Sequence, residues 1–394
     1  MLGGGIVPGS VLLLAGEPGV GKSTLLLQIA HFLSASGQSV VYVSGEESPH
    51  QIKLRSQRLG LSGEGIFLLS ETDVDLVISR LEEKRPALVI VDSIQTLYTQ
   101  DAPSGPGSVV QVRECGLRLL RWAKQRNVPV LIAGHMTKDG SLAGPRVLEH
   151  MVDAVMYLEG EDLNAYRILR VGKNRFGSTT EIGVYEMTGQ GLIEVPDPSR
   201  SLLAQRYEQA VGSALVPVIE GTRPLLLEVQ ALTSPSYAPV PRRVANGVDY
   251  NRLLMLTAVA SRRAGIDVTG QDIIVSIAGG FKVTEPAIDL GVALAIASSL
   301  YNRAIDAGSV VFGEVGLSGE LRSVPQIERR INEAVRLGLS RCILPETARR
   351  DVGSSAGAEL VYVRTLRQAL QAVLGNTGPV ARQNGHQPEV AESV

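Results

Sequence analysis

The sequence contains few cysteines and few aromatic residues. Its two cysteines, Cys115 and Cys342, lie far apart, and no CxxC pair is present. This argues against a disulfide framework and predicts two buried free thiols in a reducing compartment. Aromatic residues make up only 4% of the chain, so leucine, valine, isoleucine and alanine must build most of its core.

Long apolar runs and an excess of one charge are also missing. No run reaches the ~20 apolar residues that span a bilayer, and no basic segment followed by a cleavage site opens the chain. We therefore expect a cytoplasmic protein without a membrane partner. Lys and Arg number 38 against 40 Asp and Glu, which excludes a protein that coats nucleic acid through net charge alone.

What the chain does contain is an alternation of apolar runs and helical patterns from Val11 to about Glu186. Such alternation is typical of an α/β fold with a mostly parallel sheet and helices on both faces. A terminal β-hairpin is predicted at Ala165–Val171 and Thr180–Tyr185. The strands predicted before it are Val11–Ala15, Val40–Ser44, Ile66–Leu69, Ala87–Asp92, Val128–Ala133 and Ala154–Leu158.

The length of 394 residues exceeds what one domain usually holds, so two domains are expected. Residues 1–195 form the first predicted domain, and the Pro- and Ser-rich segment 196–201 is interpreted as a linker. Residues 202–374 form the second, and residues 375–394 are expected to be a disordered tail. The helices predicted in the second domain include Asn251–Ala264, Ala287–Leu300 and Gln326–Leu337.

A phosphate-binding motif follows the first predicted strand. The residues that match the Walker A pattern are Gly16, Glu17, Pro18, Gly19, Val20, Gly21, Lys22, Ser23 and Thr24. Glycines allow backbone N–H groups to turn toward phosphate oxygens, and the N-terminus of the following helix attracts negative charge. Lys22 is expected to contact the β- and γ-phosphates and Ser23 to bind Mg²⁺, so the predicted cofactors are ATP and Mg²⁺.

Three other strands end in residues suited to ATP hydrolysis. Asp92 is expected to hold Mg²⁺, directly or through water, although a strand-end aspartate can also be simply solvated. Glu46 is our first choice, and Glu47 our second, for the base that polarises the attacking water; the alternative is that both cap the next helix. His135 is predicted to sense the γ-phosphate, whereas a lone histidine is more often structural.

Several stretches together resemble one protein family. They are Leu2–Ser10, Gly134–Gly140, Gly144–Asp153 and the pentapeptide Lys173-Asn174-Arg175-Phe176-Gly177. They are similar to the bacterial RadA family, also called Sms, of RecA-like DNA repair ATPases, and the resemblance runs from Leu2 to about Leu374. It implies a DNA-dependent ATPase of homologous recombination with a RecA-like domain. It further implies a homohexameric ring helicase or translocase that promotes branch migration on single-stranded DNA and recombination intermediates, alongside the RecA recombinase.

The resemblance also assigns roles to four cations. Lys173 and Arg175 would reach the γ-phosphate of a neighbouring subunit, where a trans-acting cation can contribute roughly 10³–10⁵ in rate. They are candidates for DNA contact as well, and the alternative is an exposed hairpin turn. Two loops, Thr99–Ser108 and residues 138–146, would face a central channel that holds single-stranded DNA. Lys138 and Arg146 are the predicted phosphate contacts there.

Residues 202–374 resemble the Lon protease domain, an α+β fold, most clearly at Gly313–Leu321. Asp289 stands where Lon-type enzymes have the catalytic serine, and Glu328 where they have its lysine base. Because an aspartate and a glutamate cannot perform Ser/Lys acyl chemistry, we expect an inactive domain that helps to build the ring. Two basic pairs are candidate DNA contacts or simply solvated surface: Arg242-Arg243 and Arg329-Arg330.

A zinc finger of four cysteines usually opens RadA proteins, and this chain has no such cysteines. We therefore expect a truncated form and carry no zinc-binding role over. Two other classes of function stay open. One is an assembly ATPase of the KaiC kind without motor activity. The other is an ATP-dependent protease, against which Asp289 and Glu328 argue.

Overall fold

The structure is a computed structural model that describes residues 2–136, 145–160, 165–207, 209–353 and 357–375. It divides into two compact units. Unit 1 holds Met1–Pro198 with Ile219–Arg223, and unit 2 holds Ser199–Val218 with Pro224–Val394. The segment interpreted as a linker contains the start of a helix, α6 (Pro198–Leu203). The predicted tail lies outside the described residues except for Gly375.

Unit 1 alternates strands and helices. Its strands are β1 (Val11–Gly16), β2 (Val40–Ser44), β3 (Ile66–Leu69), β4 (Leu88–Asp92), β5 (Val130–His135), β6 (Ala154–Glu159), β7 (Tyr166–Asn174), β8 (Ile182–Thr188) and β9 (Gly191–Glu194). Its helices are α1 (Lys22–Ala35), α2 (Pro49–Arg58), α3 (Val74–Lys84), the 3₁₀ turn η1 (Ile94–Thr96), α4 (Val109–Arg126) and α5 (Pro145–Glu149).

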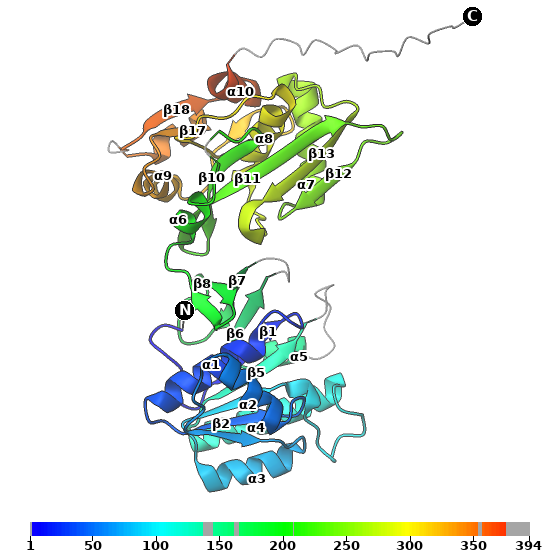
Figure 1. Cartoon of the computed structure of the whole chain (residues 1–394), viewed down its shortest axis with the longest axis vertical. Helices are drawn as coiled ribbons and strands as arrows, with labels where there is room; N and C mark the ends of the chain where they lie inside the picture. The colour runs from blue at the N-terminus through cyan, green and yellow to red at the C-terminus, as the bar shows by residue number, and fades with distance from the viewer. Residues whose placement is uncertain (1, 137–144, 161–164, 208, 354–356, 376–394) are drawn as a thin grey trace, which may run out of the picture. The chain divides into compact units, whose positions relative to one another are not determined.

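These strands make one sheet. Among the described residues, nine strands lie in the order β3-β2-β4-β5-β1-β6-β7-β8-β9 (Figure 1). The strands from β3 to β6 run parallel, and β7, β8 and β9 continue the sheet antiparallel. The predicted fold class, an α/β protein with a mostly parallel sheet, is confirmed. The predicted hairpin is not terminal, because β9 adds a further strand beside β8.

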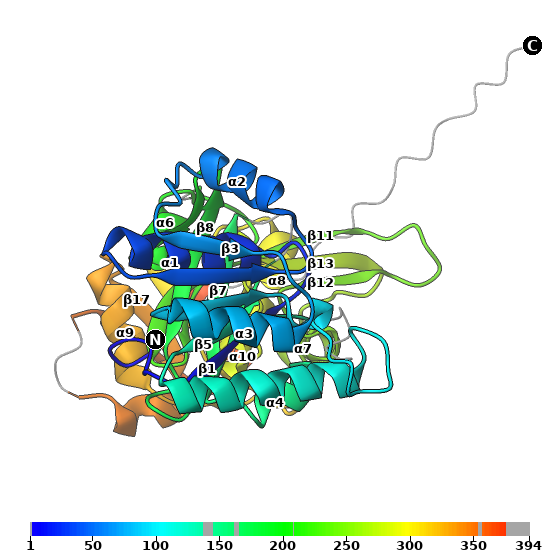
Figure 2. The same cartoon turned by 90° about the horizontal axis from the view of Figure 1, so that it is seen from below.

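The parallel strands are apolar along their length because helices cover both faces of the sheet. In β1, Val11 and Leu13 belong to the core that α3 and α4 cover, whereas Leu12 and Leu14 belong to the core that α1 and α2 cover. Figure 2 shows α3 and α4 side by side on one side of the strands and α2 on the other. The alternating directions of side chains along a strand produce these two cores.

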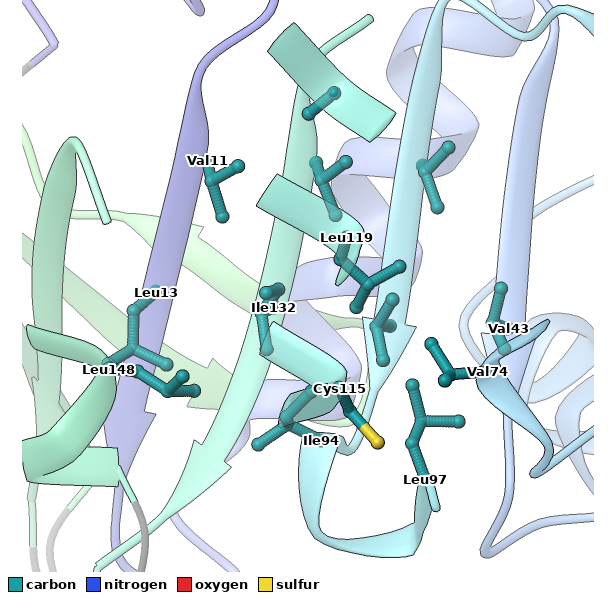
Figure 3. Packing of buried hydrophobic residues seen from close by; sticks show 14 of the residues in the cluster. Val11, Leu13, Val43, Val74, Ile94, Leu97, Cys115, Leu119, Ile132 and Leu148 are labelled. Atoms are coloured by element: carbon teal, nitrogen blue, oxygen red, sulfur yellow. The ribbon is translucent and has the colours of Figure 1, made fainter. Parts of the chain in front are cut away.

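The core under α3 and α4 contains one of the two cysteines. Cys115 of α4 is fully buried in the same cluster as Ile94 and Leu119 (Figure 3). Burial raises the pKa of its thiol to about 12, and burial does the same for Cys342 in unit 2. Both cysteines are free and buried, as predicted. A thiol with so high a pKa is not a nucleophile at neutral pH.

Side-chain caps begin most helices of unit 1. At the start of α2, Ser48 and Gln51 form a capping box, with each side chain bonded to the other's backbone N–H. Asp73 caps α3, and Ser108 caps α4. Helix α1 differs, because its N-cap is Gly21 and no side chain caps it. This exception lies at the predicted phosphate site.

Unit 2 is built around a second, mixed sheet. Its strands are β10 (Ser213–Glu220), β11 (Arg223–Pro235), β12 (Arg243–Asn246), β13 (Gln271–Ile277), β14 (Ser309–Val311), β15 (Glu314–Val315), β16 (Leu321–Arg322), β17 (Arg341–Pro345) and β18 (Glu359–Val363). Its helices are α7 (Tyr250–Val259), η2 (Ala260–Ala264), η3 (Ala278–Gly280), η4 (Pro286–Ile288), α8 (Asp289–Tyr301), α9 (Ile327–Arg336), η5 (Glu346–Asp351) and α10 (Leu366–Leu374).

Within the described part of unit 2, seven strands lie in the order β12-β13-β11-β10-β14-β17-β18, and β15 pairs with β16 apart from them. Helix α8 is buried from Asp289 to Ser298, which explains its apolar character all round. The helix predicted at Asn251–Ala264 ends as the π-helical turn η2. None of the helices that the structure describes, in either unit, has the length and hydropathy of a membrane span.

Candidate nucleotide site and trans-acting cations

The P-loop has the geometry of an anion-binding site. It joins Gly16, at the end of β1, to Lys22, at the start of α1. Gly21 has a φ of 112° at the N-cap and provides no side-chain cap. The first N–H groups of α1 therefore stay available to an external acceptor. Such groups at a helix N-terminus attract phosphate.

Close approaches from neighbouring strands require two of the glycines. A Cβ on Gly16 would lie 2.5 Å from the carbonyl oxygen of Leu158, and a Cβ on Gly21 would lie 2.5 Å from the terminal methyl carbon of Met187. Gly21 also has a positive φ that side-chain-bearing residues rarely adopt. The chain around the motif thus demands glycine at these positions, independently of any ligand.

Lys22 lies inside the loop. Its Nζ donates to the carbonyl oxygens of Gly16 at 2.9 Å and Glu17 at 2.8 Å. The residue is only 4% exposed. Burial lowers the pKa of Lys22 to about 8, although the charges of Asp92 and Glu46 act to raise it. The ammonium group is thus held within the loop and is partly deprotonated in mildly alkaline solution.

This lowered pKa predicts that nucleotide affinity depends on pH. Bound phosphate favours the ammonium form of Lys22, so nucleotide binding takes up a proton above pH 8. The Kd for ATP should therefore rise, by up to about tenfold per pH unit, above about pH 8. Titration with a fluorescent ATP analogue would measure it. The matched control is Lys22→Arg, whose charge persists at these pH values. An equal pH dependence in that variant would contradict the assignment.

The ends of four parallel strands bring the other predicted residues to this edge of the sheet. His135 of β5 pairs in register with Gly16 of β1. Ser44, two residues before Glu46, pairs with Asp92 of β4. Carboxyl ends of parallel strands form the usual ligand-binding edge of such a sheet. The structure therefore places the P-loop, Glu46, Asp92 and His135 along one edge.

Two side chains hold Glu46. Its Oε1 accepts a hydrogen bond from Ser93 Oγ at 2.6 Å and lies 3.1 Å from His135 Nε2. Burial acts to raise the pKa of Glu46, but the hydrogen bonds from Ser93 and His135 and the charge of Lys22 outweigh it. The pKa of Glu46 therefore lies below its ordinary value. The carboxylate is ionised at neutral pH and fixed in direction.

Glu47 points to a different partner. It forms an ion pair with Arg55 of α2, and its backbone carbonyl accepts a hydrogen bond from Ser44 Oγ at 3.0 Å. The alternative in which Glu46 and Glu47 cap α2 is wrong, because Ser48 caps that helix. Of the two glutamates, only Glu46 contacts the residues of the nucleotide-site edge.

Sequence reasoning missed three residues that support this site. Ser93 is fully buried and donates to Glu46, and the hydroxyl of Tyr42 donates to Asp92 Oδ2 at 2.6 Å. Gly45 is also required, because any Cβ there would overlap Thr96 of η1. The position of Ser93 directly after Asp92 could have revealed it. No pattern in the sequence singles out Tyr42, since it lies within an apolar strand.

Lys173 and Arg175 lie at the opposite edge of the sheet from the P-loop. Asn174, between them, pairs with Ala154 at the start of β6, and Ala154 also pairs with Leu12 near the start of β1. Strand β1 then takes five residue steps from Val11 to Gly16. At ~3.3 Å per step, about 17 Å separate the two edges. Neither cation reaches the P-loop of its own chain.

These two cations differ in their contacts. Lys173 Nζ donates to three backbone carbonyl groups between Glu149 and Val152, the nearest at 2.7 Å. Burial and the charge of Arg175 lower the pKa of Lys173. Arg175 Nη1 donates to Asp153 Oδ1 at 3.1 Å, and 53% of its side chain is exposed. Arg175 is therefore the cation that remains available to an external phosphate.

The predicted DNA-contacting loops are described only in part. Lys138 and the side chain of Arg146 lie outside the described residues. The loop Thr99–Ser108 is anchored by the buried side chain of Gln111, which bonds to its backbone at Thr99, Ala102 and Ser104. This loop contains Asp101 and neither lysine nor arginine. It can offer DNA only backbone N–H groups and small polar side chains.

In unit 2, Asp289 is buried in a salt bridge. Arg252 donates to both of its carboxylate oxygens, from Nε to Oδ1 at 2.8 Å and from Nη2 to Oδ2. The backbone N–H of Val315 donates to Oδ2 at 3.0 Å. Burial raises the pKa of Asp289 and outweighs these favourable contacts. Glu328 accepts a hydrogen bond from the N–H of Gly353 at 3.0 Å.

One of the basic pairs proposed for DNA contact is a poor candidate. Arg330 is 1% exposed, forms an ion pair with Glu285, and donates to the carbonyl oxygen of Pro217 at 2.7 Å. The expectation that Arg330 lies on the surface is wrong, because its guanidinium satisfies buried polar groups. Its amphipathic helix, α9, turns Arg329 outward instead.

Fold and site together define a class of protein. A mostly parallel sheet, a P-loop after its central strand β1 and acidic residues at the ends of β2 and β4 make unit 1 a RecA-like P-loop ATPase domain. Over 375 residues, the chain is 48% identical to the DNA repair protein RadA of Bacillus subtilis, covering 95% of this chain and 82% of that protein. This chain belongs to the RadA family of DNA repair proteins.

Other comparisons agree with this family. The RadA proteins of Halalkalibacterium halodurans and Listeria monocytogenes are 49% and 46% identical, again over 95% of this chain and 82% of theirs. A family model described as an AAA domain matches residues 1–141. Another, described as subunit ChlI of Mg-chelatase, matches residues 253–348.

Two solved structures show partial likeness. The RadB recombinase is 25% identical with a TM-score of 0.39, covering 49% of this chain and 94% of that one. A second solved structure, of an isolated ATPase domain, is 14% identical with a TM-score of 0.41, covering 47% of this chain and 84% of that one.

Proposed function

We propose that this chain hydrolyses Mg·ATP with Glu46 as the base that orients the attacking water. The observation that carries the proposal is the ionised Glu46 carboxylate, bonded to Ser93 and His135 on the edge that holds the P-loop. A carboxylate fixed by two neighbours can direct a water molecule at the γ-phosphate. His135, which pairs in register with Gly16, is the proposed sensor of that phosphate.

The residues of this edge fit a magnesium ion. Asp92 is 7% exposed, and Tyr42 bonds to Oδ2 alone. Asp92 and Ser23 would hold the ion, which would neutralise charge on the β- and γ-phosphates. The described residues contain no cluster of three or more His, Cys, Asp or Glu side chains for a metal ion. Nucleotide-bound Mg²⁺ needs none, since phosphates and water complete its ligands.

The proposed catalytic site is shared between subunits. Arg175 lies about 17 Å along β1 from the P-loop of its own chain. A ring would bring this edge of one subunit to the P-loop edge of the next, where Arg175 would stabilise the charge of the transferring phosphoryl group. A homohexamer is the proposed ring. Lys173 would support the segment that carries Arg175, through its bonds to the carbonyl groups near α5.

We further propose that the ring is a DNA-dependent ATPase that moves on single-stranded DNA and promotes branch migration of recombination intermediates, together with the RecA recombinase. Support comes from the family, whose members are named DNA repair proteins. Lys138 and Arg146 are the proposed DNA contacts. Contacts of lysine and arginine with phosphate are independent of base sequence, as a translocase requires.

The test of this function is ATP turnover with and without single-stranded DNA, measured together with the mass of the assembly. We expect a hexamer whose turnover rises with DNA, and whose DNA affinity falls as salt rises because phosphate contacts release counterions. A branched DNA substrate then reports strand movement. Turnover and assembly that both ignore DNA would remove the motor proposal. They would favour an assembly ATPase, to which the loop Thr99–Ser108, lacking lysine and arginine, is suited.

Unit 2 is proposed to be a Lon-protease-like scaffold without protease activity. Asp289 stands at the position of the nucleophile and is already saturated by Arg252 and Val315. An ion-paired carboxylate cannot take the role of a serine activated by a base. The proposed domains stay at residues 1–195 and 202–374.

A further inference from the structure

A buried carboxylate connects Arg175 to the strand that carries the P-loop. Asp153 precedes β6 and is 1% exposed. Its Oδ2 accepts hydrogen bonds from Val11 N–H at 3.0 Å and Lys124 Nζ at 2.9 Å. Its Oδ1 accepts a hydrogen bond from Arg175 Nη1 at 3.1 Å. Three separate segments of unit 1 thus converge on one side chain.

The backbone of Asp153 repeats two of these connections. Its N–H donates to the carbonyl oxygen of Val11 at 2.8 Å, and its carbonyl oxygen accepts from the N–H of Arg175 at 3.0 Å. Asp153 therefore fixes Arg175 at both ends, at its backbone and at its guanidinium. An arginine held in this way loses less conformational freedom when it meets a phosphate.

The charges around Asp153 explain why the hold is reversible. A buried carboxylate is costly unless cations and N–H donors surround it. Burial acts to raise the pKa of Asp153, but the bonds from Lys124, Val11 and Arg175 outweigh it and lower the pKa. Lys124 remains with the carboxylate when Arg175 turns away, so Asp153 is not left without a cation. The Nε and Nη2 of Arg175 have no partner within the described residues.

We propose that Asp153 is a positioning residue, which holds Arg175 ready for the ATP of the neighbouring subunit. The inference rests on the proposed shared site. Through the double connection to Val11, the same residue joins Arg175 to the amino end of β1. The opposite end of β1 is the P-loop of Arg175's own chain. Asp153 therefore places the trans-acting arginine relative to a strand rather than to a loop.

The test uses Asp153→Asn, which keeps an oxygen for Val11 and removes the charge that orients Arg175. We expect turnover to fall by roughly 10–100-fold, as for a misplaced catalytic group, with unchanged nucleotide binding and KM. Thermal unfolding and nucleotide binding report whether the variant folds. The matched control is Arg126→Ala, a nearby surface cation of α4 that pairs with Glu82 instead. Its turnover should equal that of the unmodified chain.

Mixed assemblies decide whether Asp153 acts on its own site or on its neighbour's. Each variant is co-assembled with equal amounts of Lys22→Ala, which supplies an intact Arg175 but no working P-loop, and is purified through a tag on one partner. Half of the chains then carry a working P-loop, and half of those adjoin an intact Arg175. About one site in four should regain full turnover in a closed ring.

Three outcomes separate the inference from the function on which it rests. Recovery with both Arg175→Ala and Asp153→Asn supports the inference. Recovery with Arg175→Ala alone shows that Asp153 serves only its own chain, which overturns the inference and leaves the shared site standing. Recovery with neither variant, or failure to co-assemble, removes the shared site and the inference with it.

Discussion

Replacing Arg175 with alanine is expected to lower ATP turnover by about 10³–10⁵-fold, the contribution of a cation that meets the transferring phosphoryl group. Nucleotide binding should remain, because Arg175 lies at the edge of the sheet opposite the P-loop of its own chain. Single-turnover hydrolysis and a separate titration with fluorescent nucleotide would measure the two quantities. A wild-type rate would remove Arg175 from the proposed site.

Lys173→Ala provides the comparison. The ammonium group of Lys173 satisfies three backbone carbonyl groups between Glu149 and Val152, so its loss leaves them without this donor. We expect a lower unfolding temperature and a smaller loss of turnover than for Arg175→Ala. Equal losses of turnover with unchanged stability would instead assign both cations to the phosphate.

Glu46→Gln should lower turnover by about 10²–10⁴-fold, the usual contribution of a general base. Glutamine keeps the shape of the side chain and its acceptor oxygen for Ser93 but cannot polarise water as a carboxylate does. ATP should still bind, because the P-loop and Lys22 are untouched. Product formation in a single turnover, followed with radiolabelled ATP, would separate the chemical step from binding.

The matched control for Glu46 is its neighbour. Glu47→Gln removes the same charge one residue along the chain, where the carboxylate pairs with Arg55 and not with Ser93. Its turnover should stay close to that of the unmodified chain. If Glu47→Gln caused the larger loss, the base would have to be reassigned and Glu46 would be left with a structural role.

Much of unit 1 could be predicted because its signals are local. The apolar runs at Val40–Ser44 and Ile66–Leu69 and the helical patterns at Lys22–Ala35 and Val74–Lys84 correspond to β2, β3, α1 and α3 with the same bounds. Each pattern has one period over several residues and ends at a glycine, a cap or a charged residue. The short strands β9 and β12 were not predicted, since four residues carry too little periodicity.

The candidate site divides in the same way. The spacing of Gly16, Gly21 and Lys22 is a local motif, so it could be recognised in the sequence. Ser93 as the partner of Glu46, and Asp153 as the partner of Arg175, come from residues 47 and 22 positions apart. No local pattern links such residues, because their proximity depends on strand order and register.

By itself, the sequence determined the P-loop, the alternation of strands and helices, and the set of residues that can bind a phosphate and a metal ion. These follow from backbone conformation and apolar periodicity, which act over a few residues. Only the tertiary structure decided which glutamate faces Ser93, and that Arg175 stands at the far edge from its own P-loop. The physical reason is that parallel strands bring together residues distant in sequence at one edge, and an antiparallel strand carries its end to the other.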